Sequence, residues 1–461
     1  MKRGDTHSGK LRADTFQMDM LEGPIFKTLV LFALPLLLSN IFQQLYNTVD
    51  TMIVGNHLGD TSLAAIGVCA PIYDLLVGFA LGIGNGLAIV TARSFGAGDE
   101  EELKRSVAGS IVIGVVSSLG ITGGAQLFLR PLLVLLDTPP EVIEEAYSYI
   151  ATITLYVIVM FAYNLCAGLL RAIGNSVMPL VFLILSSCLN IVLDLFFITR
   201  LGMGVKGAAV ATVIAQGISV LLCLLYILCK SKILIPEREH FSVGKEMYQE
   251  LLGQGFSMGF MSSIVSAGSV ILQYGINGLG SLIIAGHTTA RKLYMFCIMP
   301  IIAMAMAFST FVSQNKGADQ GVRIRKAARY VYLYSLLITV VIMGLTWVLA
   351  PTLVKWVSGS REAVLLDNAA RYLKVVSPFY AVLGVLCATR SALQGLGQKL
   401  LPLVSSIIEF FGKILFVLLF IPRFGYIAVI LCEPVIWCVM TVQLVYTFYA
   451  DPYIRSFKGK G

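Results

Sequence analysis

The chain has 461 residues, of which 57% are apolar and only 13% are Asp, Glu, Lys or Arg. One membrane span needs about 20 apolar residues, and roughly a dozen windows of that length can be read along the chain. The composition therefore predicts an all-α integral membrane protein and excludes a soluble one. The basic residues behind the net charge of +8 lie mainly in the predicted connections between spans. Their placement indicates how the protein is oriented in the membrane, and we expect no nucleic-acid partner.

Hydropathy predicts twelve spans. Basic residues gather before the first span, near the middle of the chain and at its end, while the alternate connections hold far fewer. This asymmetry places both termini in the cytoplasm of a plasma or inner membrane protein, and we expect no removable signal peptide. The predicted spans are 28–53, 63–92, 104–129, 141–168, 178–199, 205–230, 250–277, 284–314, 326–350, 365–392, 402–421 and 426–449.

The connection 231–249 is the only long polar stretch between predicted spans, and it separates two sets of six. The expected organisation is a cytoplasmic segment 1–24, a first lobe 25–230, a cytoplasmic linker 231–249, a second lobe 250–449 and a cytoplasmic tail 450–461.

The two sets repeat each other. At an offset of 221 residues Tyr73 aligns with Tyr294, and at 223 Gly174 aligns with Gly397. A unit of six spans has even parity, so both copies share one orientation about an axis along the membrane normal. We therefore expect twelve transmembrane helices in two pseudo-symmetric six-helix bundles around a central cavity.

Two carboxylates, Asp50 and Asp194, lie inside predicted spans. A charge in the bilayer core is costly, so an ionisable residue there is a candidate functional site. The polar residues that precede Asp50 fall on one helical face, which must line protein or water rather than lipid. These residues are Asn40, Gln43, Gln44 and Asn47.

Polar groups on the fourth to sixth predicted spans extend this set. Asn190 shares a helical face with Asp194, Thr212 lies on the next span, and Tyr163 and Asn164 project inward or into a neighbour. Carboxylate, amide and hydroxyl oxygens suit a hard cation, and two close carboxylates in an apolar setting suit proton exchange. Asn164 and Thr212 are equally consistent with hydrogen bonding between helices.

The second half lacks this acidic set, so ion coupling is predicted for the first half. The positions aligned with Asp50, Asn164, Asn190 and Asp194 are Ile271, Cys387, Lys413 and Val417.

Other charged residues within spans have two interpretations. Asp74 suits either a cavity wall or an interfacial cap. Glu409 and Lys413, four residues apart, favour an intrahelical ion pair over substrate contact. Glu433 either pairs with Arg291 or attracts a cationic substrate.

Glycine, methionine and cysteine residues recur within the predicted spans. Met258 and Met261 either pack or form a surface that accepts many ligands. The nine cysteines contain no CxxC pair, so we predict neither a disulfide nor a fixed metal site. The stretch 202–207 matches GxGxxG but follows a predicted span, which indicates a hinge. A spacing of four permits close helix approach at Gly78, Gly82 and Gly86.

Residues 20–450 resemble the multidrug and toxic compound extrusion (MATE) family. The stretches that carry the resemblance are YNTVDTMIVGNHLG, SFGAGD, LLRAIGNSVMPL, NIVLDLFFI and LQGLGQKLLPL. The YNxVD and NxxxD pieces resemble its DinF-like branch. The resemblance implies export of amphipathic, often cationic, organic compounds in exchange for H⁺ or Na⁺. It also implies that Pro35 is the bending point of the first helix, and that the cation or proton site comprises Asp50, Asn190, Asp194 and Thr212, with Asn164 beside them.

The leading hypothesis is a monomeric secondary active multidrug exporter, not an enzyme, that needs no cofactor besides its coupling ion. A lipid-linked oligosaccharide flippase of the same superfamily is the alternative, but it would favour a strongly cationic cavity. The candidate substrate-cavity residues are Gln43, Asn47, Asp74, Tyr163, Met258, Met261, Tyr294 and Glu433.

Overall fold

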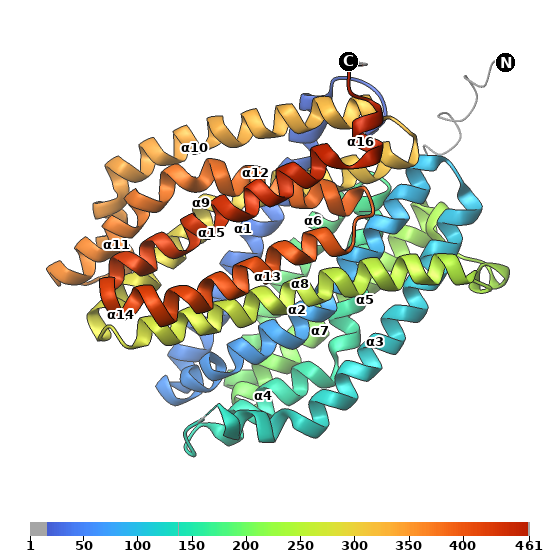
Figure 1. Ribbon diagram of the computed structural model, residues 1–461. Helices are drawn as coiled ribbons and strands as arrows, with labels where there is room; N and C mark the ends of the chain where they lie inside the picture. The colour runs from blue at the N-terminus through green and yellow to red at the C-terminus, as the bar shows by residue number, and fades with distance from the viewer. Residues whose placement is uncertain (1–15, 137, 460–461) are drawn as a thin grey trace, which may run out of the picture. The chain divides into compact units, whose positions relative to one another are not determined.

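The protein is built from long helices, and the residues described by the computed structural model, 16–136 and 138–459, contain no β-strand (Figure 1). Of the predicted N-terminal segment 1–24, positions 1–15 lie outside the described residues. Of the predicted tail 450–461, positions 460 and 461 lie outside them. The helices are α1 (Ile25–Leu58), α2 (Asp60–Ala97), α3 (Glu100–Leu135), α4 (Ile143–Leu155), α5 (Val157–Ala172), α6 (Val177–Leu195), α7 (Gly204–Lys230), α8 (Lys245–Asn277), α9 (Ser281–Gly317), α10 (Gly321–Ser358), α11 (Ala363–Val376), α12 (Tyr380–Gly395), α13 (Leu400–Leu415), α14 (Ile421–Phe424), α15 (Tyr426–Ala450) and α16 (Pro452–Ser456).

Short helical segments of other types join or extend these helices. The π-helical segment η1 (Phe196–Arg200) continues α6, and the π-helical segment η5 (Phe416–Phe420) continues α13. The remaining segments are the 3₁₀ turns η2 (Lys232–Leu234), η3 (Arg238–Phe241) and η4 (Ser377–Phe379).

The predicted all-α membrane fold is confirmed. In the described part of the chain, 11 helical stretches are long and apolar enough to cross a membrane. The helices α4 and α5, bent by 48° at their junction, make up to 12 when they are counted as one span. Each predicted span coincides with one of these stretches, because a continuous apolar run of this length must satisfy its backbone hydrogen bonds within a helix.

The linker is shorter than the predicted 231–249. Helix α8 already begins at Lys245, and the turns η2 and η3 occupy part of the connection before it. Lys, Glu, Met and Gln between positions 245 and 249 have good helix propensity, so the helix extends beyond its apolar part.

Contacts along the chain define two compact units. Among the described residues, the first contains 16–21 together with Leu38–Ser263 and Ser313–Asp319, and the second contains Glu22–Leu37, Ile264–Val312 and 320–459. These bounds differ from the predicted lobes because the long helices α1, α8 and α9 each contribute one part to each unit.

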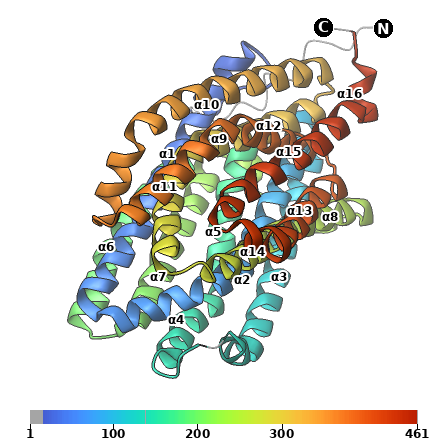
Figure 2. The same cartoon turned by 60° about the vertical axis from the view of Figure 1, so that its left-hand side comes forward.

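In the first unit, α2 packs against α3, α4 and α5, and α6 packs along α7 (Figure 2). Close approach of α2 and α8 depends on glycine at two of the three predicted positions, Gly82 and Gly86, but not at Gly78. A Cβ added to Gly82 would lie 2.6 Å from the carbonyl oxygen of Met258, whereas a Cβ on Gly78 would meet nothing within 4 Å.

In the second unit, α10, α12, α15 and α13 follow one another as neighbours and run in the same general direction in the figure (Figure 1). The order of helices matches that of the first half, since α6 and α13 both end in a π-helical segment. The GxGxxG stretch begins in the turn before α7 and continues into the first turn of that helix. Gly202 and Gly204, the first residue of α7, adopt positive φ angles of 62° and 60°. The predicted hinge is therefore confined to the start of the stretch.

Candidate functional site

Two carboxylic side chains meet in the first unit. Asp50 extends from the second half of α1, and Asp194 extends from the last turn of α6. Their carboxyl groups lie within hydrogen-bonding reach of each other, and Asp194 is fully buried. The structure therefore joins the two residues that the sequence singled out.

Asn190 and Thr212 connect this pair to α7. With its amide nitrogen toward Asp194, Asn190 donates to Asp194 Oδ2 at 2.7 Å, and its oxygen accepts from the backbone N–H of Thr212 at 3.1 Å. The opposite amide orientation leaves only a 3.4 Å contact from Nδ2 to Thr212 Oγ1 and sets two acceptors against each other. We therefore assign the first orientation, in which both ends of the amide are satisfied.

Apolar packing closes the site on the other side. Ile53 and Val54 of α1, Ile198 of η1 and Ala208 of α7 form a small buried cluster in the turns after Asp50 and Asp194. This cluster packs α1, η1 and α7 together next to the turns that carry Asp50 and Asp194.

A cavity of about 540 Å³ opens beside Asp50 and is lined entirely by residues of the first unit, whereas Asp194 and Asn190 are not among its lining residues. Its wall contains no Lys, Arg or His among the described residues, so its charge is acidic. The predicted residues that line it are Gln43, Asn47, Asp50, Asp74, Tyr163, Asn164 and Thr212.

Three tyrosines that sequence reasoning left out of the site also line this cavity: Tyr46, Tyr73 and Tyr149. The hydroxyl group of Tyr46 lies 3.2 Å from Thr212 Oγ1. A signal for Tyr46 was present, since it precedes Asp50 by four residues and so shares its helical face. Tyr73 and Tyr149 come from α2 and α4, and only the tertiary fold brings them together.

Asn164 and Tyr163 line the cavity while bonding to nearby backbone. Asn164 Nδ2 donates to the carbonyl of Met160 at 2.9 Å, and the Tyr163 hydroxyl donates to the carbonyl of Pro179 at 3.4 Å. Each side chain therefore has a structural hydrogen-bond partner and also lines the cavity.

Met258 and Met261 do not line this cavity. Both lie on α8, where Met261 is buried and the backbone of Met258 contacts Gly82 of α2. The tight α2–α8 contact uses this part of α8 for packing, and a substrate contact by these methionines stays a prediction.

Tyr294 and Glu433 also lie elsewhere, in the second unit. The ring of Tyr294 stacks on Trp437 with centroids 6.3 Å apart, and the Arg291 guanidinium lies 4.5 Å from the Tyr294 ring centroid. Glu433 Oε2 pairs with Arg291 Nη1 at 2.6 Å. The structure thus selects the ion pair with Arg291 from the two interpretations of Glu433.

Pro35 lies inside α1, which is one continuous helix from Ile25 to Leu58. The division between the two compact units falls in α1 after Leu37, close to this proline. Proline removes one backbone hydrogen bond of the helix, so α1 has a weak point in this turn.

In the described part of the chain, 11 apolar helical spans, or 12 with the bent pair α4 and α5, and a cavity next to neighbouring carboxyl groups define a multi-pass membrane protein. The chain belongs to the MatE family, whose profile matches it twice, at residues 35–196 and again at 258–419. The two matched ranges are shifted by the same 223 residues that align Gly174 with Gly397, which confirms the internal repeat.

Curated relatives include two bacterial multidrug proteins. The probable multidrug resistance protein YpnP of Bacillus subtilis is 29% identical over 397 residues, which cover 85% of this chain and 87% of that protein. The multidrug export protein MepA of Staphylococcus saprophyticus is 24% identical over 381 residues, which cover 81% of this chain and 82% of that protein.

Solved structures share the fold. One is a multidrug resistance MATE family transporter of the MOP superfamily in an outward-facing conformation, with a TM-score of 0.87 and 23% identity over 96% of this chain and 99% of that one. Another is a MOP superfamily transporter from Pyrococcus furiosus, described as having a binding pocket of reverse polarity, with a TM-score of 0.86 and 24% identity over 95% and 99% of the two chains.

Proposed function

We propose that this protein is a secondary active exporter that exchanges amphipathic organic compounds, often cationic, for H⁺ or Na⁺. The observation that supports it most directly is the Asp50–Asp194 pair beside an acidic cavity in the first unit. Intramembrane carboxylates of this kind are costly unless they exchange a proton or bind a cation. The names of the relatives as multidrug proteins support the substrate class.

The pair suits a proton or a small hard cation. One oxygen of each carboxyl group, Oδ1, is buried with no donor in reach among the described residues. A proton shared by the pair would satisfy both oxygens, and Na⁺ would add the carboxylate oxygens to nearby amide and hydroxyl oxygens. Asn190 and Thr212 fix the position of Asp194. Binding of a proton or cation at the pair would therefore alter contacts of α1, α6 and α7 together.

The cavity suits an organic cation. Its volume of about 540 Å³ lies in the range of roughly 300–1,000 Å³ that accommodates drug-sized ligands. Tyrosine rings attract cations through their faces, and Asp74 adds a carboxylate to a wall that already contains Tyr73. A lipid-linked oligosaccharide needs basic side chains for its pyrophosphate, and the acidic wall disfavours that alternative.

Loading would be transmitted through α1. Asp50 lies on this helix, and Pro35 weakens its backbone some turns earlier. Replacing Pro35 by Ala restores the missing N–H donor, so the Pro35→Ala variant should load ions normally but export more slowly. We further propose that the protein is a monomer with both termini in the cytoplasm and that it follows the DinF-like branch of the family.

Efflux from proteoliposomes under separately imposed gradients tests the proposal. Ethidium export should be driven by a proton gradient or a sodium gradient and should vanish when both are absent. An export rate that depends on neither the proton gradient nor the sodium gradient would refute antiport. Scrambling of a fluorescent pyrophosphate-linked lipid without ethidium export would favour the flippase.

A further inference from the structure

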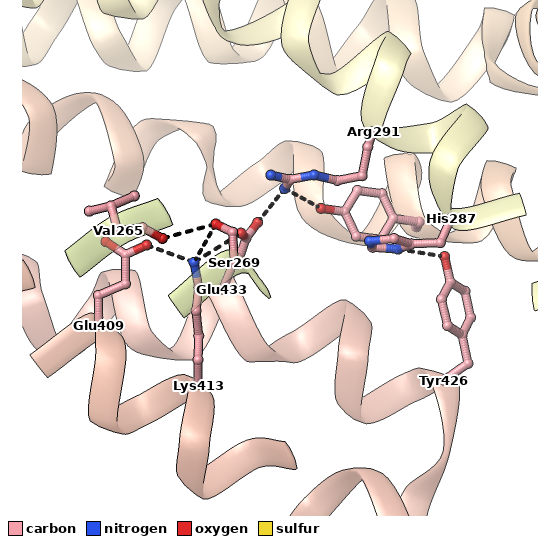
Figure 3. Close-up of polar contacts among 9 residues, drawn as sticks. Val265, Ser269, His287, Arg291, Glu409, Lys413, Tyr426 and Glu433 are labelled. Atoms are coloured by element: carbon pink, nitrogen blue, oxygen red, sulfur yellow. Dashed lines mark hydrogen bonds and ion pairs between the residues drawn. The ribbon is translucent and has the colours of Figure 1, made fainter. Parts of the chain in front are cut away.

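The second unit contains a buried network of ion pairs (Figure 3). Lys413 of α13 is 1% exposed, and its Nζ lies 2.8 Å from Glu409 Oε1 and 3.8 Å from Glu433 Oε1. Ser269 Oγ of α8 lies 3.5 Å from the same Nζ. The ammonium group is therefore surrounded by oxygens from three helices, α8, α13 and α15.

These three helices are the repeat partners of the helices that build the first-half pair. The two family matches align α1 with α8 and α6 with α13, and α7 and α15 follow as the next spans. In the first half α1, α6 and α7 supply Asp50, Asp194 and Thr212. Corresponding helices of the two halves thus each carry a cluster of oxygen ligands, at different positions along the helices.

The clusters also share their aromatic surroundings. Tyr73 and Tyr149 line the first-half cavity. Their repeat counterparts Tyr294 and Tyr372 contact Arg291, whose Nη1 donates to the Tyr372 hydroxyl at 3.2 Å. The correspondence therefore extends beyond the charged groups.

The clusters differ in the source of positive charge. The first-half cavity is lined by no basic side chain among the described residues. In the second half Lys413 replaces Asn190, and the two carboxylates Glu409 and Glu433 are matched by Lys413 and Arg291. The charges balance without any added ion, which a buried network requires.

The packing of α8 accommodates the lysine stem. A Cβ added to Gly268 would approach Lys413 Cδ to 3.2 Å, and one added to Gly275 would approach Val417 to 3.0 Å. Glycine on this face of α8 lets α13 lie close enough for Nζ to reach Ser269. The ammonium position is therefore built into the helix contact and does not result from a mobile surface side chain.

We infer that the second half contains a cation site that is permanently occupied by the ammonium group of Lys413. The ligands of this site suit a small monovalent cation. In this chain the cation is the lysine ammonium group itself. This accounts for a repeat in which corresponding helices of both halves gather oxygens, although only the second half supplies a cation of its own. The inference stands on the second-unit contacts and is independent of the proposed transport function.

Chemical rescue tests this inference. The Lys413→Ala variant removes the tethered ammonium and leaves Glu409, Glu433 and Ser269 in place. Its melting temperature in detergent should rise by roughly 3 °C or more in saturating ammonium or sodium chloride relative to choline chloride at equal ionic strength. Choline is too large to enter the same position.

Matched variants separate a site from a general salt effect. The wild type and Lys413→Arg retain the tethered charge. The melting temperature of each should therefore be the same in the three salts. The double variant Glu409→Gln/Lys413→Met balances the charge without a cation and should lose the rescue. Equal melting temperatures of Lys413→Ala in all three salts would overturn the inference.

Failure of Lys413→Ala to fold also decides the matter. Recovery of folded protein only when ammonium is present during purification supports a cation site. No recovery in any salt, together with failure of the charge-balanced double variant, would mean that packing of the lysine stem matters rather than its charge, and the inference would be wrong.

Discussion

The carboxyl groups of Asp50 and Asp194 lie within hydrogen-bonding reach of each other, although they belong to α1 and α6. Each residue is therefore part of the other's environment. Groups that share one proton or one cation act as a unit, and removing either member removes the function of both.

Asp50→Asn and Asp194→Asn should each lower the rate of gradient-driven ethidium efflux by roughly tenfold or more. Membrane expression should be retained. The double variant should be no worse than either single one, because the pair acts together. Efflux from proteoliposomes measures this. Asp367→Asn, an exposed carboxylate on α11, is the matched control, and undiminished efflux by either pair variant contradicts the assignment.

Much of this site was predictable from residue type and spacing. Asp50, Asp194 and Asn190 stand out because polar residues are rare within spans, and helical periodicity places Asn190 on the face of Asp194. The twelve spans follow from hydropathy, since lipid leaves the backbone few alternatives to a helix. The start of α8 at Lys245, inside the predicted linker, was missed because helix propensity continues beyond the apolar segment.

Other parts of the site depend on tertiary packing that local sequence does not encode. Tyr149 reaches the cavity from α4, and its apolar neighbours in sequence indicate only a span. Met258 looked like a cavity residue by type, yet the glycines of α2 draw α8 into contact at that point. The network around Lys413 was predicted only as the intrahelical pair with Glu409, because Glu433 and Ser269 come from other helices.

Tyr46 should tune the affinity of the site for its coupling ion. Its hydroxyl lies 3.2 Å from Thr212 Oγ1, and such a hydrogen bond contributes about 1 kcal/mol, or roughly fivefold in affinity. Tyr46→Phe and Thr212→Val should each raise the ion concentration for half-maximal efflux by about this factor. The double variant should show no further increase, and an additive effect would mean that the hydroxyl groups act separately.

Gly82 should be essential for the contact between α2 and α8. A methyl group there would meet the Met258 carbonyl oxygen at 2.6 Å, and relieving such overlap costs about 1–3 kcal/mol. Gly82→Ala should lower the melting temperature in detergent by several degrees. Gly78→Ala, one turn earlier with open space around it, should leave stability unchanged or slightly raised, and equal behaviour of the two variants would contradict the close approach.

Arg291 should stabilise the second unit through Glu433. Arg291 Nη1 lies 2.6 Å from Glu433 Oε2, whereas the other cation near this carboxylate, Lys413, lies 3.8 Å from its Oε1. Removing one member of a buried ion pair leaves the other charge uncompensated and costs about 3 kcal/mol, so Arg291→Met should unfold at clearly lower temperature. Lys292→Met, at the exposed next position, is the control. The double variant Arg291→Met/Glu433→Gln should recover much of the loss, since the carboxylate no longer needs a partner; no recovery would show that Arg291 acts through its contacts with Tyr294 and Tyr372 instead.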